Sequence, residues 1–456
     1  MASQYPETPL EKREELFVPF LSAEKPHDEY RIGPEMEKFG VLSGGRPIGY
    51  DGPTGVSRFM EMLAKEHGWM PEGEGPGGPT IALLRNHASI TLEPGSQFEL
   101  SGAAHEDVHQ VFSEAVRHHS EIAPLSKELG VRWLGVGFHP FAKCADYTFV
   151  PKMRYGIMRE YLPTRGEHAL DMMLRTATVQ ANFDYSSEKD AMQKMRVALR
   201  LSPMNTALFA NSPFYEGKVH GGKTYRGKVW LDVDPDRSGL VPSLLESDAS
   251  YEKYVEWALD VPMFMLKREG KPIKNTGQTF RSFWKEGFEG YSATQNDWQT
   301  HLNTLFPEVR LKKTLEIRGA DSQDTPLMAA LAALWTGILY DEEALHACDE
   351  LTADWNHDEL MALRPAAAHG GLEATFRGKP LAAYAERVIS ISKSGLMRRK
   401  RIDANGKDES KFLEPLEKLA ASAKSPADDL LARAKANAKG GDLDPASIIA
   451  AAEITT

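Results

Sequence analysis

The chain has 456 residues, of which 41% are hydrophobic and 26% charged, a composition typical of a globular protein with one to three domains. Its 54 basic and 65 acidic residues give a net charge of −11, which argues against a general nucleic-acid or anionic-membrane binder but leaves room for a local basic pocket. Two cysteines, Cys144 and Cys348, cannot form a disulfide framework, and the polar N-terminus lacks the apolar core of a signal peptide. These features predict a reduced, cytoplasmic protein.

Taken in chain order, the sequence pattern predicts a sheet-rich part up to about residue 320 and helices after it. The expected helices are 55–67 (ended by Gly68), 104–129 (capped by Ser101), 187–199 and 251–259, followed by several helices from Pro326 onward. The expected strands are 81–84 and 89–93 as a hairpin, then 131–138, 178–185, 228–233 and 310–318. The longest apolar run, 327–340, is too short for a membrane span, which needs about 20 residues, so it predicts a buried helix. The overall expectation is an α+β fold built on an antiparallel sheet.

The segment Gly217 to Thr224 satisfies the P-loop pattern. A working P-loop opens a helix whose first amides hold phosphate. The residues that follow Thr224 resemble a strand, so we expect no helix there and set a nucleotide-binding P-loop aside.

The segment His105 to His109 satisfies the zinc-peptidase pattern, in which two histidines on one helix face bind the metal. Asp107 is charged where an apolar residue is expected, and no third ligand follows at a familiar spacing. The alternative, a polar helix start whose acidic residues favour the helix dipole, is preferred.

Four predicted strands alternate apolar residues with polar ones, so each presents one polar face. The polar side chains are Glu35 and Glu37 on 31–39, Glu93 and Glu99 on 90–100, Thr178, Gln180 and Asn182 on 178–184, and Glu316 and Arg318 on 314–318. A solvated outer face is the simple alternative for each strand alone. Five carboxylates beside amides and an arginine, with no cysteine, instead suit Mg²⁺ and a nucleotide bound through it.

At these residues the sequence resembles the plant-type glutamate–cysteine ligases, which also occur in bacteria. The resemblance runs from about Glu24 to Arg399. Its most specific segments are Arg31 to Gly40, Ser89 to Gly102, Arg154 to Tyr161, Leu170 to Ser187, Leu208 to Gly217, Ala258 to Met263, Asn296 to Leu311, Glu316 to Asp321 and Leu351 to Trp355.

The resemblance implies a glutamine-synthetase-like antiparallel sheet and an ATP-dependent ligase. Such enzymes phosphorylate the γ-carboxylate of glutamate and join it to the amine of cysteine, the first step of glutathione biosynthesis. The resemblance implies that two or three Mg²⁺ ions are bound by Glu35, Glu37, Glu93, Glu99 and Glu316, and that Gln180 and Glu316 also contact ATP. It implies catalytic roles for Arg318 and Arg237. The residues expected to contact substrate are Arg154, Tyr155, Thr178 and Asn182.

Plant members of the family use cysteine pairs for redox control, and this chain departs from them. Asn275 stands at one such position, no cysteine lies near Gly290, and Cys144 and Cys348 match neither pair. We therefore expect no disulfide switch, a monomer or weak homodimer, and a cytoplasmic bacterial member. The expected parts are a mobile arm (1–23), a catalytic domain (24–400) and a C-terminal helical extension (401–456).

The expected partners are glutamate, cysteine and ATP, with glutathione as a candidate feedback inhibitor and with no nucleic acid or membrane. Two alternatives stay open. One is a related ligase with another amine acceptor, or the same reaction in another thiol pathway, because acceptor choice depends on pocket shape. The other is a non-catalytic nucleotide- or metal-binding relative.

Overall fold

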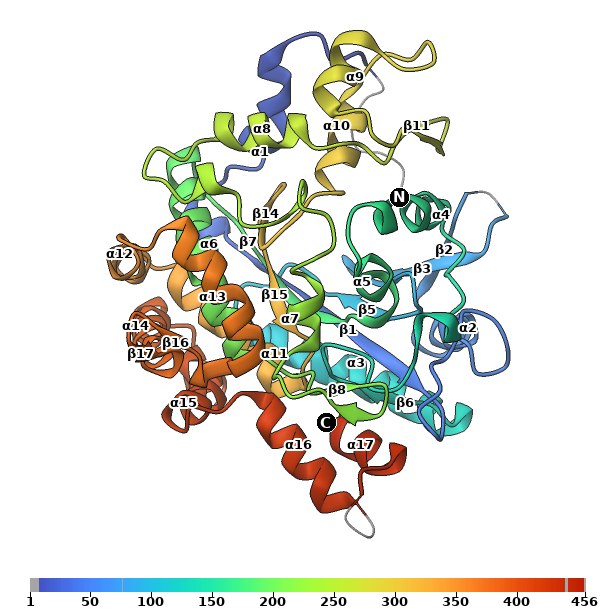
Figure 1. The fold of residues 1–456 in the computed structure, drawn as a ribbon, viewed down its shortest axis with the longest axis vertical. Helices are drawn as coiled ribbons and strands as arrows, with labels where there is room; N and C mark the ends of the chain where they lie inside the picture. Colours follow the sequence, from blue (N-terminus) through green and yellow to red (C-terminus); the bar gives the residue numbers. More distant parts are fainter. Residues whose placement is uncertain (1–7, 76, 439–441, 455–456) are drawn as a thin grey trace.

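The centre of the molecule is a nine-stranded antiparallel sheet, whose strands run among the helices in Figure 1. This computed structural model describes residues 8–75, 77–438 and 442–454. The strand order is β14-β15-β7-β1-β5-β4-β3-β2, and β6 pairs with the far end of β1. The strands are β1 (Ile32–Val41), β2 (Met70–Gly73), β3 (Thr80–Arg85), β4 (Ala88–Leu92), β5 (Phe98–Ser101), β6 (Arg132–Leu134), β7 (Thr178–Phe183), β14 (Val309–Leu311) and β15 (Leu315–Asp321).

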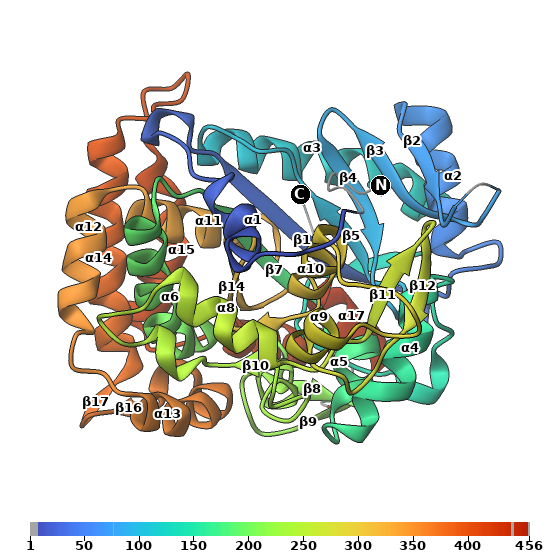
Figure 2. The same cartoon turned by 90° about the horizontal axis from the view of Figure 1, so that it is seen from above.

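Helices pack around this sheet. The longer helices are α2 (Val56–His67), α3 (Val108–Leu129), α6 (Glu188–Leu208), α8 (Tyr251–Asp260), α11 (Thr325–Leu339), α12 (Glu342–Leu351), α13 (His357–Gly370), α14 (Leu381–Arg399) and α16 (Pro426–Asn437). The shorter helices are α4 (Met153–Tyr161), α5 (Ala169–Arg175), α7 (Tyr225–Val229), α9 (Phe280–Glu286), α10 (Gln295–Leu302), α15 (Glu414–Ala421) and α17 (Pro445–Ala452). Figure 2 shows α6, α11, α12 and α14 gathered at the β7 side of the sheet, opposite the β2–β3 hairpin.

The core lies between the sheet and these helices because each central strand alternates. Val179, Ala181 and Phe183 of β7 point back into the same apolar cluster as Met36 of β1 and Ile317 of β15. Residues at odd and even positions of a strand face opposite sides, so the polar residues between them line the other face. We call that other side the front face.

Several predicted elements are confirmed. α2 ends at Gly68, which has the left-handed backbone conformation (φ 70°) that glycine adopts without strain. β3 and β4 form the expected hairpin, and α8 matches its predicted range. α11 is buried, and none of the described helices is long and apolar enough to cross a membrane. The antiparallel sheet and the α+β class are as expected.

Other boundaries differ from the prediction. α3 begins at Val108, because Asp107 rather than Ser101 caps it and accepts a hydrogen bond from the Gln110 amide. The expected strand 310–318 is two strands that turn back on each other, β14 and β15. The expected strand 228–233 overlaps helix α7, which Thr224 caps. Of the expected strand 131–138, only Arg132–Leu134 is in the sheet.

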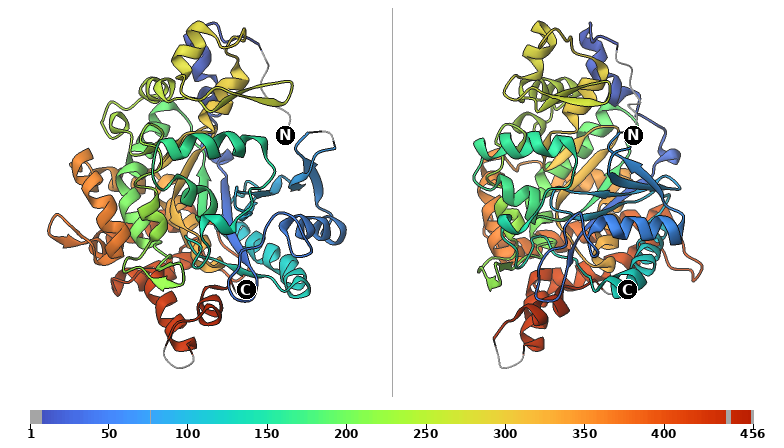
Figure 3. Two further views of the ribbon diagram at one scale, coloured as in Figure 1. Left: turned by 45° about the vertical axis from the view of Figure 1, so that its right-hand side comes forward. Right: turned by 90° about the vertical axis from the view of Figure 1, so that its right-hand side faces the viewer.

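The two ends of the chain pack onto the domain. The arm 1–23 was expected to be mobile, and residues 1–7 lie outside the described part; from residue 8 on it is packed, with Leu16 and Phe20 fully buried. In the C-terminal extension, Leu430 and Ile448 join an apolar cluster with Leu134 of β6. Figure 3 shows α16 and α17 at the end of the molecule away from α9 and α10.

Candidate active site

The front face carries the polar side chains that the sequence singled out. The strand register places Glu37 opposite Glu99 and Glu35 opposite both Gln180 and Ser101. Glu316 lies opposite Asn182 on the next strand pair. β1, β5, β7 and β15 therefore bring together residues from four separate parts of the chain.

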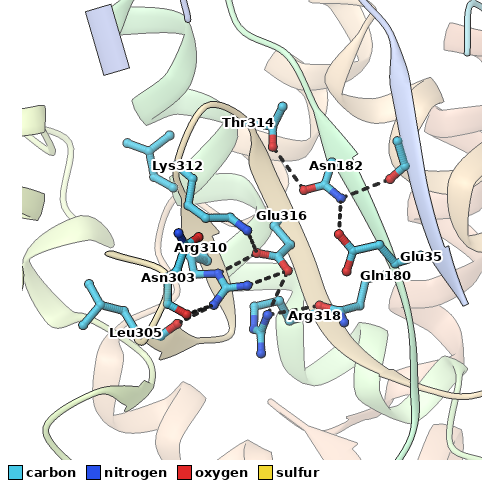
Figure 4. A network of polar contacts seen from close by, with 12 residues as sticks. Glu35, Gln180, Asn182, Asn303, Leu305, Arg310, Lys312, Thr314, Glu316 and Arg318 are labelled. Atoms are coloured by element: carbon cyan, nitrogen blue, oxygen red, sulfur yellow. Dashed lines mark hydrogen bonds and ion pairs between the residues drawn. The ribbon is translucent and has the colours of Figure 1, made fainter. Parts of the chain in front are cut away.

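Three cations surround Glu316 at the β14–β15 side of this face; we call Arg310, Lys312 and Arg318 the cationic group (Figure 4). Arg310 donates two hydrogen bonds to the Glu316 carboxylate, at 2.6 and 2.9 Å. Arg318 Nη1 donates to the same carboxylate at 2.9 Å, and Lys312 Nζ lies 3.2 Å away. Burial alone would raise the pKa of Glu316, but the cationic group holds it well below its usual range.

Carboxylates gather on the other side of the face; we call Glu35, Glu37, Glu93 and Glu99 the acidic group. Burial, with the repulsion of Glu99 and Glu93, raises the pKa of Glu37 well above its usual range. Burial and the charges of Glu316 and Glu99 raise the pKa of Glu35 to about 7. The side chains of this group therefore destabilise one another's charges.

The amides of β7 connect the two groups. Gln180 accepts a hydrogen bond from Arg318 Nη1 at 3.1 Å, and its own Nε2 lies 3.5 Å from Glu37 Oε1. Asn182 Nδ2 donates to Glu35 Oε1 at 2.8 Å, as Figure 4 shows. Thr178 donates to Glu37 through both its backbone amide (2.9 Å) and its hydroxyl (3.2 Å). The middle strand thus orients side chains of both signs.

The start of α4 lies at the edge of the acidic group. Lys152 Nζ and the Tyr155 hydroxyl both donate to the Leu92 carbonyl, at 2.7 and 2.8 Å, next to Glu93. Burial, with the nearby Arg154, lowers the pKa of Lys152 to about 8. Arg154 is exposed, packs over the Tyr155 ring, and has its pKa raised by Tyr155 and then by Glu93.

Arg226 of α7 adds a further buried cation beside Arg318. Its Nη2 donates to the Arg318 carbonyl at 2.8 Å, and its Nε makes no hydrogen bond among the described residues. A small cavity of about 30 Å³ borders both arginines and is also lined by Trp230, Glu308 and Arg364. Polar groups around this cavity are what an anionic ligand group would contact.

Asp321 fixes the position of Arg226. Its carboxylate accepts hydrogen bonds from the Asn211 amide (2.7 Å), the Ser212 hydroxyl (2.7 Å) and the Thr224 hydroxyl (2.8 Å). Thr224 in turn caps α7, the helix that carries Arg226. The end of β15 therefore determines where this helix starts.

Arg237 lies away from these groups. It is fully buried and donates to Asp234 (2.6 Å) and to the carbonyls of Thr304 (3.1 Å) and Pro262 (2.7 Å). Its guanidinium also packs over the Phe264 ring at 4.0 Å. All three of its nitrogens have protein partners, none of which belongs to the cationic or acidic group, and its catalytic role stays a prediction.

The P-loop-like segment does open a helix, α7, so the prediction that no helix follows Thr224 is wrong. Its amides nevertheless have protein partners: Lys223 and Thr224 donate to the carbonyl of Ala368, and Gly217 to that of Pro140. The Lys223 ammonium is paired with Asp428 and Glu373. These groups are committed within the protein, and α7 has only five residues.

The two histidines of the zinc-peptidase pattern do not share a site. His105 lies before α3 and contacts Glu114 at 2.8 Å, whereas His109 is near the Arg401 carbonyl. Across the described ranges of the chain, no group of three or more His, Cys, Asp or Glu side chains is arranged to hold a metal ion.

Sequence reasoning missed Arg226, Arg310, Lys312 and Lys152. Arg310 and Lys312 were within a segment assigned to one straight strand, which hid their approach to Glu316. A turn at 312–314 would have revealed it, but that segment contains no glycine, proline or asparagine. Arg226 lies beside a segment assigned to a strand, and no local pattern marks it.

The sequence and the fold both match known proteins. The pattern that defines glutamate–cysteine ligase family 2 (GCS2) matches residues 31–447. A glutamate–cysteine ligase from Arabidopsis thaliana is 43% identical over 423 residues, 92% of this chain and 79% of that protein. Glutamate–cysteine ligase B from Oryza sativa subsp. japonica is 42% identical, over 93% of this chain and 84% of its own length.

Two solved structures share the fold at low identity. A glutamate–cysteine ligase from Francisella tularensis, in complex with AMP, has a TM-score of 0.56 at 13% identity and covers 93% of this chain and 87% of its own. A bifunctional glutathione synthetase from Pasteurella multocida has a TM-score of 0.51 at 12% identity, with 96% and 52% covered.

The relatives correct one expectation. Both plant enzymes are named as chloroplastic, which contradicts the predicted cytoplasmic location. Cysteine count and N-terminal composition were the grounds for that prediction, and neither decides the compartment. The family pattern matches residues 31–447, and the identity to the plant enzymes exceeds 40%. The chain therefore belongs to glutamate–cysteine ligase family 2.

Proposed function

We propose that this chain joins the γ-carboxylate of L-glutamate to the amine of L-cysteine in an ATP-dependent reaction, the first step of glutathione biosynthesis. Membership of the family and the similarity to plant glutamate–cysteine ligases support the reaction. The observation that carries the site is the division of the front face into a cationic and an acidic group, connected by Gln180.

This division suits a meeting of two anions. The γ-carboxylate and the terminal phosphate of ATP repel each other, so each needs its own opposite charge while they approach. We assign the γ-carboxylate to Arg318 and Arg226, which border one cavity and whose Nε atoms make no described hydrogen bond. The phosphates then lie toward the acidic group, where bound Mg²⁺ would supply the positive charge.

The reaction proceeds in two transfers. An oxygen of the γ-carboxylate forms a bond to the terminal phosphorus of ATP as the bond to ADP breaks, giving γ-glutamyl phosphate. The cysteine amine then attacks the acyl carbon, phosphate leaves, and the amine releases a proton to solvent. Arg318 and Arg226 stabilise the negative charge that develops at the acyl oxygens. Glu316 and Gln180 keep the Arg318 guanidinium in place.

We assign Mg²⁺ to the acidic group, Glu35, Glu37, Glu93 and Glu99. The fit rests on its chemistry: these are oxygen donors, and burial together with nearby carboxylate charge raises the pKa of Glu35, Glu37 and Glu99. When bound, Mg²⁺ neutralises phosphate charge. One or two carboxylates with phosphate oxygens and water suffice for each ion, which agrees with the absence of a complete three-residue site in the described chain. Glu316 already has three cationic partners, so we leave it out of this set.

The remaining predicted contacts are assigned by position. Thr178, Gln180 and Asn182 orient Glu37, Arg318 and Glu35 rather than facing substrate alone. Arg154 and Tyr155 lie near Glu93, where Arg154 is the group available to a second substrate carboxylate or to ATP. Glutathione as a feedback inhibitor, and a monomer or weak homodimer, stay part of the proposal.

The test is ADP release by the purified chain with ATP, Mg²⁺ and glutamate, with and without cysteine. We expect release that depends on both amino acids, with γ-glutamylcysteine as product. Release only with another amine would keep the acyl-phosphate chemistry and replace the acceptor. No release with any amine would refute the proposal and favour a non-catalytic nucleotide-binding protein.

A further inference from the structure

A cleft of about 510 Å³ lies between the start of α11 and the C-terminal helices. Its walls come from α15, α16 and α17, which Figure 1 labels in the lower part of the molecule. Its volume is within the range of small-molecule sites, roughly 300–1,000 Å³. None of the residues that line it belongs to the cationic or acidic group of the front face.

The floor of the cleft contains an unused hydrogen-bond acceptor. Gln323 is fully buried, and its Nε2 donates to the Phe209 carbonyl at 2.7 Å. Its Oε1 has no hydrogen-bond partner among the described residues. Beside it, Asn211 uses its amide nitrogen for the carbonyls of Gly135 and Ser322, at 2.8 and 3.0 Å. A buried carbonyl without a partner is costly, so a ligand N–H at this floor would be stabilised.

The rim carries two opposite charges that remain unpaired. Lys424 and Asp429 both line the cleft and are exposed, yet their side chains make no hydrogen bond or ion pair with each other or with any other described residue. Other charged groups of the cleft are engaged, because Arg433 donates to the Ala451 carbonyl at 3.1 Å and Lys418 pairs with Glu414 at 2.8 Å. Only one cation and one anion of the rim are therefore free within the described chain.

We infer that this cleft binds a small zwitterion, a free amino acid or a dipeptide. Its carboxylate pairs with Lys424, its ammonium group with Asp429, and an N–H donates to Gln323 Oε1. Leu419 and Leu430 provide apolar wall for its carbon chain. A purely anionic or cationic ligand would leave one of the two rim charges unpaired.

The experiment is isothermal titration calorimetry of the full chain with γ-glutamylcysteine and, separately, L-glutamate. Two variants separate the sites: Arg318→Ala removes the proposed active-site contact, and Ala450→Trp fills the cleft from α17. Ala432→Trp changes an alanine of α16 that is also exposed but lies outside the cleft, and it is the matched control.

We expect two binding sites in the unmodified chain and in Ala432→Trp, one in each of the two separating variants, and none in their combination. Lys424→Ala and Asp429→Ala should each weaken the Arg318-independent site at least tenfold. A single site that Arg318→Ala abolishes, for both probes, would overturn the inference. If the unmodified chain shows a single site that Arg318→Ala leaves intact and Ala450→Trp abolishes, the result would count against the proposed function and leave the cleft assignment standing.

Discussion

Arg310 and Glu316 face each other across the turn between β14 and β15 and are joined by two hydrogen bonds, at 2.6 and 2.9 Å. The side chain of Glu316 is only 1% exposed, so its charge is compensated by protein rather than by water. Arg318 shares the same carboxylate. Glu316 thus holds two arginines in fixed positions, one of which we assign to the substrate.

Replacing Glu316 by Gln should abolish turnover while the fold is kept. The change leaves Arg310, Lys312 and Arg318 with uncompensated charge, which costs about 3 kcal/mol of unfolding free energy. Because Arg318 loses its positioning partner, kcat/KM should fall about a hundredfold or more. Steady-state kinetics and urea unfolding measure the two effects. Glu359→Gln, which alters a more exposed pair with Arg377, is the control, and unchanged activity in Glu316→Gln would remove Glu316 from the site.

Replacing Asp321 by Asn should raise KM for glutamate about tenfold, because Arg226 loses a fixed position. The amide nitrogen introduced at position 321 would face one of the three groups that now donate to the carboxylate, those of Asn211, Ser212 and Thr224. This should lower the free energy of unfolding by about 1–3 kcal/mol. Kinetics with glutamate and ATP varied separately distinguish the roles: KM for ATP should change little. An equal change in both KM values would instead indicate general loosening. Asp341→Asn, at the cap of α12, is the control.

The contribution of Glu35 to the stability of the ligand-free protein should fall as pH rises from about 5 to 8, so the difference in unfolding free energy between the unmodified chain and Glu35→Gln should change across this range. The pKa of Glu35 is about 7 in the folded chain and 4.5 ordinarily, so between these values the folded state binds a proton that the unfolded chain has released. The loss attributable to Glu35 is at most roughly 3 kcal/mol. Thermal unfolding across this pH range tests it, with exposed Glu386→Gln as control; parallel curves for all three proteins would contradict it.

Replacing Lys223 by Ala should leave kcat and KM for ATP within about twofold of the unmodified values. Lys223 pairs with Asp428 of α16, so the variant should lose about 1 kcal/mol of stability at most. Kinetics and thermal unfolding measure both. A large loss of ATP turnover with unchanged stability would instead revive the P-loop alternative.

The sequence alone could predict the polar face of each central strand. The side-chain period of a strand is two, so Glu35 and Glu37, or Gln180 and Asn182, must share a face whenever the strand forms. The same local chemistry sets the ends of helices, as Gly68 shows at the end of α2. The family resemblance then placed these faces on an antiparallel sheet, which the structure contains.

Only the tertiary structure decided which charges meet. Arg310 reaches Glu316 because the chain reverses between them, and Arg226 reaches Arg318 because Asp321 fixes the start of α7. Arg237 matched the family pattern, yet its fold neighbours Asp234, Thr304 and Pro262 occupy its donors. Local pattern fixes the direction of a side chain from its own backbone, whereas its partners depend on strand register and on segments distant in the chain.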